Sequence, residues 1–137
     1  MNEPAPKLTD PAPAPSPLRL GLVVPCFNEA DQLAASMDAL AAKLDALVVA
    51  GLIRENSFVL LVDDGSTDDT WGLIEARCAG DQRFEGLRLA VNAGQQTAIF
   101  AGLQTAVDRC GAALSLDADL QDDLSAIDAM LEQLAEG

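Results

Sequence analysis

Acidic and amide side chains gather in two short segments of this 137-residue chain, residues 63–69 (DDGSTDD) and 117–123 (DADLQDD). In the second segment, Asp117 and Asp119 stand at positions i and i+2, where two carboxylates of one loop can bind a single hard cation. Gln121 adds an oxygen two residues further on. Such donors suit Mg²⁺ or Mn²⁺ completed by phosphate and water. Because an acidic pocket repels a diphosphate unless a cation bridges them, the segment predicts a joint site for metal and phosphate ligand.

The other acids of the two segments favour a structural role. Asp68, Asp69, Asp122 and Asp123 stand where helices are expected to begin, and a carboxylate there complements free N–H groups and the helix dipole. The first segment can still offer one carboxylate to a base N–H or a ribose hydroxyl, while Gly65 permits the tight turn that this requires.

The charge and the missing residue types exclude several classes of protein. Eight Lys and Arg against 22 Asp and Glu give a net charge of −14, which argues against binding to nucleic acid or to an anionic membrane surface. The chain has no histidine, so it holds no Ser-His-Asp or Cys-His nucleophile and no histidine base. Its cysteines form no CxxC pair and are expected to be reduced, packed in or near the core of a cytoplasmic protein: Cys26, Cys78 and Cys110.

No stretch approaches the roughly 20 apolar residues that a membrane span needs, so no span is expected in this chain. All seven prolines fall within the first 25 residues. We therefore expect an extended Pro/Ala-rich tail at residues 1–17, followed by one domain at residues 18–137.

Apolar runs and helical periodicity alternate through that domain. Strands are predicted at residues 20–24, 57–62, 87–91 and 112–116, and helices at 29–49, 68–78, 97–109 and 124–135. Four strand–helix units in sequence predict an α/β fold, a Rossmann-like parallel sheet with helices on both faces.

Local signals predict how these helices begin, end and pack. Asn28 is the expected N-cap of the first helix and Gly51 its stop, and Ser66 and Thr67 are expected to cap the second helix through their hydroxyls. The side chains expected to face the sheet from the later helices include Trp71, Ile74, Cys78, Ile99, Leu103, Ala106, Val107, Ile127, Met130, Leu131 and Leu134.

In parallel sheets, ligands bind beyond the carboxyl ends of the strands. The four predicted strands run into residues 26–29, 63–69, 92–96 and 117–123, so their polar side chains meet at one edge and predict a site there. The first loop lacks GxGxxG and the chain lacks GxxxxGK[ST]. These absences argue against a dinucleotide site and a P-loop.

Four motifs, VVPCFNEAD, LLVDDGSTDDTW, NAGQQTAIFAGL and LSLDADLQDD, resemble in order and separation those of the GT-A family 2 glycosyltransferases. The resemblance extends over about residues 20–137 and is greatest to polyprenyl-phosphate sugar transferases of the dolichol-phosphate mannosyltransferase type. It implies a cell-envelope enzyme, with its full-length form at the cytoplasmic face of the membrane. Such an enzyme moves a sugar, with inversion, from a nucleotide diphosphate-sugar to an acceptor such as a polyprenyl phosphate or a glycan.

The same resemblance implies Mg²⁺ or Mn²⁺ as cofactor and places the catalytic base beyond residue 137. The chain would then be the donor-binding part of a longer enzyme and inactive alone. The alternative is a non-catalytic module that binds a nucleotide diphosphate and a divalent metal.

Site residues follow from the resemblance by position. The implied contacts with the nucleotide-sugar are Pro25, Phe27, Glu29, Val62, Asp64, Asp117, Ala118 and Asp119. The implied metal ligands, around the DXD-like motif, are Asp119, Gln121 and Asp117. Two features depart from the family: Phe27 replaces the more common Tyr, and the third motif has Asn92, Gln95 and Gln96 but no cationic phosphate contact.

Overall fold

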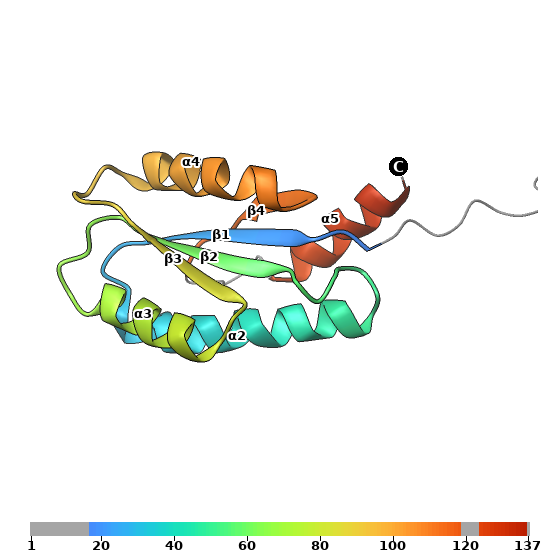
Figure 1. Cartoon of the computed structure of the whole chain (residues 1–137), viewed down its shortest axis with the longest axis horizontal. Coiled ribbons are helices and arrows are strands. Elements are labelled where there is room, and N and C mark those ends of the chain that lie inside the picture. The colour runs from blue at the N-terminus through green and yellow to red at the C-terminus, as the bar shows by residue number, and fades with distance from the viewer. Residues whose placement is uncertain (1–16, 119–123, 137) are drawn as a thin grey trace, which may run out of the picture.

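A computed structural model of the chain describes residues 17–118 and 124–136. The elements follow in the order β1 (Leu20–Cys26), α2 (Ala30–Val49), β2 (Phe58–Asp63), α3 (Thr70–Gly80), β3 (Phe84–Arg88), α4 (Gln95–Ala106), η1 (Val107–Arg109), β4 (Ala112–Ser115) and α5 (Leu124–Glu136). Helices α2 and α3 cover one face of the sheet and α4 covers the other (Figure 1). The expected α/β architecture is confirmed.

The four strands pair in parallel in the order β3-β2-β1-β4. The central strands β1 and β2 are buried along their whole length, as the near-continuous apolar runs of a parallel sheet covered on both faces require. Cys26 pairs with Asp63 at the ends of these strands, so the segments that follow β1 and β2 leave the sheet at the same level.

Strand β1 extends through Pro25, although the sequence predicted that proline would end it. The carbonyl of Cys26 accepts the N–H of Asp64 on the β2 side, and the carbonyl of Val23 accepts the N–H of Leu116 on the β4 side. Since alternate residues of a parallel strand bond to opposite neighbours, Pro25 faces the β4 side. The pairing with β4 stops at Val23, so the missing N–H of Pro25 costs no ladder hydrogen bond.

Strand β3 begins at Phe84, three residues before its predicted start. The apolar run at residues 87–91 suggested a later strand, but Val91 is 70% exposed while Phe84 is 2% exposed. Arg77 of α3 stacks on the Phe84 ring, with its guanidinium carbon 4.7 Å from the ring centre. Burial of this aromatic side chain beneath α3 sets the register of the edge strand.

Helix α4 faces the sheet with its smallest residues, Ala98, Gly102 and Ala106. A Cβ atom on Gly102 would contact Val23 and would lie 2.8 Å from Cγ2 of Val62, so glycine permits the close approach of helix and sheet. Val107, predicted to face inward, is 60% exposed. It falls in the tighter turn η1 that follows α4, which shifts it off the buried face.

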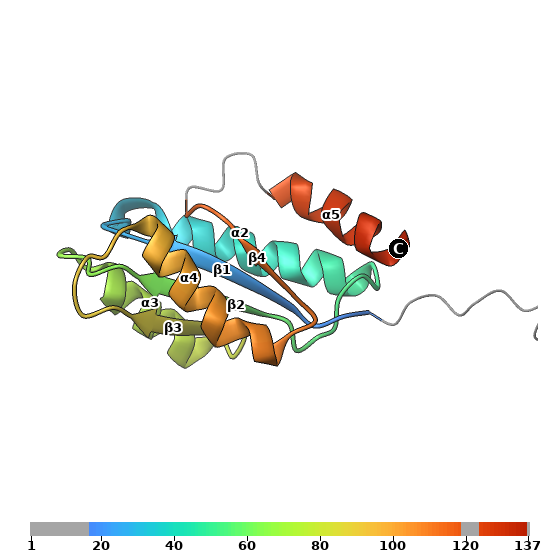
Figure 2. The same ribbon diagram turned by 90° about the horizontal axis from the view of Figure 1, so that it is seen from above.

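Helix α5 packs beside α2 (Figure 2), where Lys43 and Asp128 form an ion pair of 2.8 Å. Ile127 and Leu131 are buried in the core as predicted, but Met130 is 43% exposed and its inward prediction is wrong. The side chain of Leu134 lies outside the described residues. Within residues 17–118 and 124–136, no helix has the length and apolar character to span a membrane.

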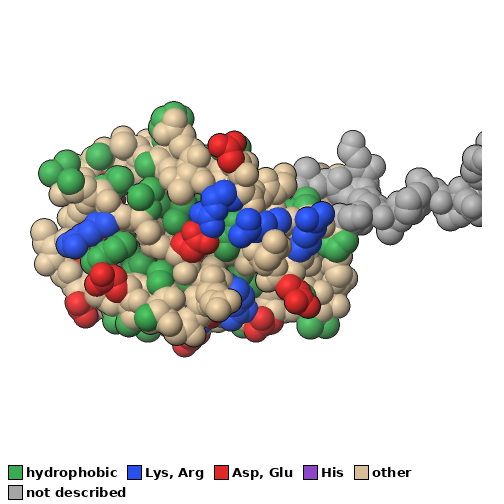
Figure 3. Space-filling view, in the orientation of Figure 1, with side chains coloured by type: hydrophobic (Ala, Val, Ile, Leu, Met, Phe, Trp, Pro, Cys, Tyr) green, Lys and Arg blue, Asp and Glu red, His purple; other side chains and the backbone are tan. Residues whose placement is uncertain are grey.

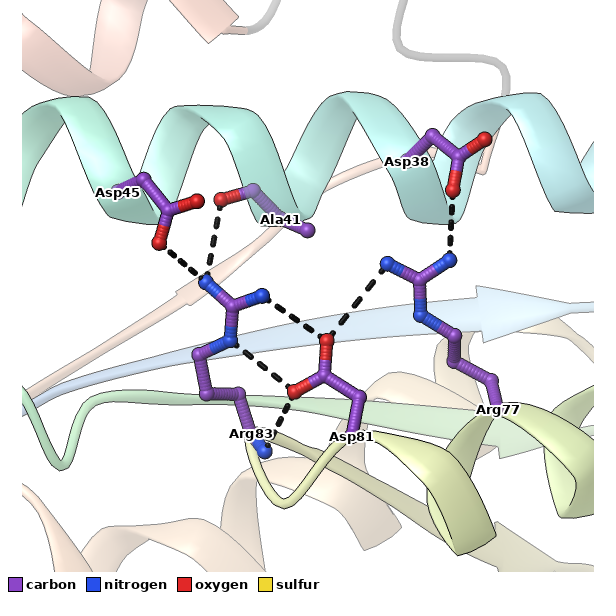
Figure 4. Close-up of polar contacts among 6 residues, drawn as sticks. All are labelled: Asp38, Ala41, Asp45, Arg77, Asp81 and Arg83. Carbon is purple, nitrogen blue, oxygen red and sulfur yellow. Dashed lines mark hydrogen bonds and ion pairs between the residues drawn. The ribbon is translucent and has the colours of Figure 1, made fainter.

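An arginine–aspartate network fastens α2 to the α3–β3 connection (Figure 4). Arg83 donates to both carboxylate oxygens of Asp81, at 3.0 and 2.9 Å, and to Asp45 of α2. Arg77 donates to Asp38 of the same helix at 2.6 Å. The hydrogen bond from Arg83 holds the pKa of Asp81 below its ordinary value. These contacts fix the α2–α3 layer on which the site loops stand.

Candidate active site

A cavity of about 560 Å³ opens at the carboxyl edge of the sheet. It is lined by the end of β1, by residues from all four predicted strand-end segments and by one side chain of α2: Pro25, Cys26, Phe27, Glu29, Gln32, Asp64, Asn92, Gly94, Gln95, Asp117 and Ala118. Six of the expected nucleotide contacts therefore come together around one space.

The first wall of the cavity follows β1. Pro25, Phe27 and Glu29 line it, and the Phe27 ring is 43% exposed. Gln32, one helical turn after Glu29, donates its side-chain amide to the Glu29 carboxylate. The sequence analysis missed Gln32, although its i+3 spacing from Glu29 places both side chains on one helix face.

The loop after β1 is interlocked with the turn after β2. The N–H of Asn28 donates to Oγ of Ser66 at 2.9 Å, and Oδ1 of Asn28 accepts the N–H of Thr67 at 2.8 Å. Asn28 is therefore not the N-cap of α2. That position is held by Glu29 without a side-chain hydrogen bond. Ser66 and Thr67 contact Asn28 instead of capping α3, so these predictions are also wrong.

Asp68 supports the starts of two helices, which extends its expected role as a helix-start acid. Its Oδ1 accepts the N–H of Thr70 at 2.9 Å, and its Oδ2 accepts the N–H of Ala30 at 3.2 Å. The Thr70 hydroxyl, which donates to the same carboxylate, is the main cause of a lowered pKa for Asp68. The carboxylate thus stays ionised beside the free N–H groups of both helices.

Asp64 holds the loop between β3 and α4. Its Oδ1 accepts the N–H of Ala93 at 2.7 Å, and its Oδ2 accepts the N–H of Gly94 at 3.0 Å and the amide of Asn92 at 3.2 Å. The residue is 3% exposed but still lines the cavity. A carboxylate has about four acceptor positions, so Asp64 keeps capacity for a ligand after fixing this loop.

Gly65 adopts the conformation that the tight turn requires, with φ of 72°. A Cβ atom at this position would lie 2.7 Å from the carbonyl carbon of Val91. The turn after β2 and the loop after β3 are therefore in direct contact, and glycine allows it.

The far wall of the cavity follows β4. Asp117 is exposed, and its Oδ1 accepts the side-chain amide of Gln95 at 3.0 Å. The carbonyl of Ala118 accepts the hydroxyl of Ser36 at 2.6 Å, which ties this wall to α2. Asp119 and Gln121, the other expected metal ligands, and the helix-start acids Asp122 and Asp123 lie outside the described residues.

Val62 does not reach the cavity. Its side chain is fully buried on the face of the sheet that α4 covers. The sequence motif identified the right strand end, but the side chain of Val62 is taken up by packing against Val23 and Ala98 beneath α4.

The cavity is lined by acids and lacks basic side chains among the residues that the structure describes. Glu29, Asp64 and Asp117 contribute to the lining. On the face shown in the space-filling view, most Lys and Arg side chains lie between the middle of the molecule and the end where the chain continues as a grey trace, and one lies at the other end (Figure 3). At the edge of the sheet opposite the cavity, Arg54 and two further arginines line a separate pocket: Arg19 and Arg109.

Cys26 contributes a neutral thiol to the base of the cavity. Burial, and secondarily the nearby Glu29 and Asp63, raise the pKa of Cys26 to about 12. A thiol with this pKa is protonated at neutral pH and is a poor nucleophile. Cys26, Cys78 and Cys110 are all free thiols, in agreement with their predicted packing role.

The carboxylate of Asp117 is chemically suited to bind a hard divalent cation. Its carboxylate is exposed in the cavity, and the hydrogen bond from Gln95 engages one of its two oxygens. In the ranges 17–118 and 124–136, no group of three or more His, Cys, Asp or Glu side chains is arranged to hold a metal. Asp117 supplies one oxygen donor of the type that Mg²⁺ and Mn²⁺ prefer.

Comparison with known families shows to which family the chain belongs. The sequence model of glycosyl transferase family 2 matches residues 22–137. The chain belongs to glycosyl transferase family 2. The family that the sequence motifs resemble is thereby confirmed.

Similar proteins from bacteria are considerably longer than this chain. An uncharacterized glycosyltransferase of Bacillus subtilis, YkoT, is 43% identical over 118 residues, which are 86% of this chain and 35% of the relative. Undecaprenyl-phosphate 4-deoxy-4-formamido-L-arabinose transferase of Aeromonas hydrophila is 34% identical over 119 residues, 86% of this chain and 34% of the relative. The chain thus spans about a third of the length of these relatives.

A solved structure supports the fold. The mannosyltransferase PcManGT from Pyrobaculum calidifontis, in complex with GDP-Man and Mn²⁺, superposes with a TM-score of 0.61 at 24% identity. The match covers 82% of this chain and 32% of that chain. The shared architecture is the sheet and helices described above.

Proposed function

We propose that the protein transfers a sugar from a nucleotide diphosphate-sugar to a polyprenyl phosphate, and that the cavity at the carboxyl edge is its donor site. One observation carries this proposal. Residues from four segments, far apart in a family 2 glycosyltransferase sequence, line one cavity at the edge where parallel sheets bind ligands. The undecaprenyl-phosphate sugar transferase among its relatives supports the acceptor.

The nucleotide would lie between the walls that follow β1 and β2. The exposed ring of Phe27 offers a flat apolar surface for the base. Glu29 and the remaining acceptor capacity of Asp64 can receive hydrogen bonds from base N–H groups and ribose hydroxyls. Pro25 contributes a rigid wall, and Val62 could contribute only through its main chain, because its side chain is buried.

The diphosphate would lie toward the wall formed by Asp117 and Ala118. We propose that Asp117, with Asp119 and Gln121, holds Mg²⁺ or Mn²⁺. When bound, the cation would offset the charge of the diphosphate and stabilise it as leaving group. Gln95 orients Asp117 for this role through its 3.0 Å hydrogen bond.

The catalytic base is expected outside residues 18–137, which we propose as the donor domain. In relatives about three times as long, the rest of the chain is available to bind the acceptor and remove its proton. We expect a single displacement, which inverts the anomeric centre. The three free thiols suit the reducing cytoplasmic side of the membrane.

Transfer is tested on the protein in its full genomic length, with labelled UDP- and GDP-sugars and undecaprenyl phosphate in detergent. We expect a labelled glycolipid with one of the donors, and at least a tenfold loss of product in Asp117→Asn. Asp108→Asn, at an exposed aspartate of η1 that lies outside the four segments, is the control. Metal-dependent nucleotide binding without any glycolipid would contradict transfer and favour a non-catalytic binding module.

A further inference from the structure

We propose that Asn28 is a positioning residue of the donor site. Its hydrogen bonds hold the turn after β2 against the loop after β1, and so set the distance between two walls of the cavity. This role rests on the proposed function, because it assigns Asn28 to the donor site. The residue itself does not line the cavity. It stands between Phe27 and Glu29, which both do.

The contacts of Asn28 are unusually concentrated for an exposed side chain. Its Oδ1 accepts the N–H of Thr67 at 2.8 Å, the N–H of Asp68 at 3.3 Å and the hydroxyl of Thr67 at 3.3 Å. Its own N–H donates to Oγ of Ser66 at 2.9 Å. One residue therefore fastens three consecutive residues of the opposing turn.

The backbone of Asn28 is also unusual. With φ of 52°, it is the one non-glycine residue at positive φ in the part of the chain that the structure describes. Asparagine adopts this left-handed region more readily than most residues with a side chain. Backbone strain of this kind persists where surrounding contacts hold it, and it concentrates at functional sites. Here the four hydrogen bonds to residues 66–68 hold it.

Further hydrogen bonds connect the turn after β2 to a third segment of the cavity. One residue, Gly65, separates the turn at residues 66–68 from Asp64, whose carboxylate accepts the N–H groups of Ala93 and Gly94. Hydrogen bonds thus connect the segments after β1, β2 and β3, which lie together at one end of the sheet (Figure 2). A ligand that contacts both walls binds more tightly when the walls are ordered beforehand, since binding then costs less conformational entropy.

Two substitutions separate the acceptor of Asn28 from its backbone conformation. Asn28→Gly keeps the positive φ accessible but removes the acceptor, whereas Asn28→Asp keeps an acceptor oxygen and tolerates the same backbone. Asn56→Gly is the matched control. Asn56 is an exposed asparagine of the α2–β2 connection whose main-chain carbonyl accepts a hydrogen bond from Arg19.

The variants are compared by calorimetric titration of UDP and of GDP in the presence of Mn²⁺. We expect Asn28→Gly to weaken binding at least tenfold, Asn28→Asp to stay within fivefold of the unaltered protein, and Asn56→Gly to leave the affinity unchanged. Rescue by aspartate separates a hydrogen-bonding role from general loosening of the loop.

Hydrogen exchange without nucleotide gives a second readout. The amides of Thr67 and Asp68 should exchange faster in Asn28→Gly than in the unaltered protein and Asn28→Asp. Unchanged exchange of these amides, or unchanged nucleotide affinity in Asn28→Gly, would overturn the role of Asn28 and leave the proposed function intact. If the unaltered protein binds neither nucleotide with Mn²⁺, the proposed function fails, and the donor-site role of Asn28 fails with it.

Discussion

At the scale of single residues, Asp64 combines structural support with a place in the candidate site. Both of its oxygens accept main-chain N–H groups from the β3–α4 loop, and it is almost fully buried. Charge-assisted hydrogen bonds of this kind order a loop strongly. The arrangement explains how a loop without basic residues keeps a fixed position beside an acidic turn.

Asp64→Asn should destabilise the fold, because an amide presents only one acceptor oxygen to two N–H groups. Leaving a partly buried N–H without its acceptor costs about 1 kcal/mol in the free energy of unfolding, the lower end of the range for buried groups. Urea denaturation measures this change. Asp108→Asn, an exposed change, should alter the free energy of unfolding by less than about 0.5 kcal/mol. Equal stability of the two variants would show that the loop does not depend on Asp64.

Cys26 should make stability depend on pH in the alkaline range. Its pKa is about 12 in the folded protein against 9.0 ordinarily. Below pH 9 the thiol is protonated in both the folded and the unfolded state, so its full contribution to the free energy of unfolding is present. Between pH 9 and 12 the unfolded chain loses this proton while the folded protein keeps it, so the free energy of unfolding falls as pH rises, by up to about 1.4 kcal/mol per pH unit.

Urea denaturation at pH 8 and pH 10.5 tests this dependence, with Cys26→Ala as the comparison. The unaltered protein should lose more stability between the two pH values than the variant does. An identical loss in both would show that other groups cause the alkaline destabilisation.

The residue types of the site were readable from the sequence, but their orientations were not. Pro25, Phe27 and Glu29 could be assigned to one wall because a motif fixes their order after a strand. Asn28, in the same motif, was misassigned as a helix cap. Its partners at residues 66–68 lie 38 to 40 positions away, and local spacing carries no information about such contacts.

At the scale of elements, the buried face of helix α4 is hard to recognise in the sequence because its residues are small. Its inward residues are alanine and glycine, while Phe100 is 62% exposed. Periodicity located the helix and the inward position of Ala106 but missed Ala98 and Gly102, and Val107 was misassigned because it falls in the turn η1. The parallel sheet was predicted correctly because β1, β2 and β4 are distinct apolar runs between turn signals, whereas the apolar run at residues 87–91 placed the start of β3 three residues too late.

Gly102→Ala should destabilise the protein, because the added methyl would contact Val23 and lie 2.8 Å from Val62. Overpacking of this kind costs roughly 1–3 kcal/mol. Gly80→Ala is the matched control, since a Cβ atom at that helical position meets nothing within 4 Å. Thermal unfolding of both variants should show a lower Tm only for Gly102→Ala. A Tm unchanged by Gly102→Ala would mean that α4 can move away from the sheet without loss.

At the scale of the whole molecule, the pockets at the two ends of the sheet are lined by side chains of opposite charge. The carboxyl edge carries Glu29, Asp64 and Asp117 around the cavity. Arg19, Arg54 and Arg109 surround the opposite edge. With a net charge of −14 and three acids around the cavity, the protein offers a diphosphate an unfavourable field at the proposed donor site. Binding there therefore calls for a divalent cation.

The central claim is that nucleotide diphosphates bind at this cavity only together with a divalent metal. Calorimetric titration of UDP and GDP, with Mn²⁺ and separately with EDTA, tests it most directly. We predict binding of at least one nucleotide with Mn²⁺ and none with EDTA. Asp117→Asn and Asp119→Asn should each weaken binding by about tenfold, roughly 1.4 kcal/mol, and Asp108→Asn should not. Equal affinity with Mn²⁺ and with EDTA would contradict the claim.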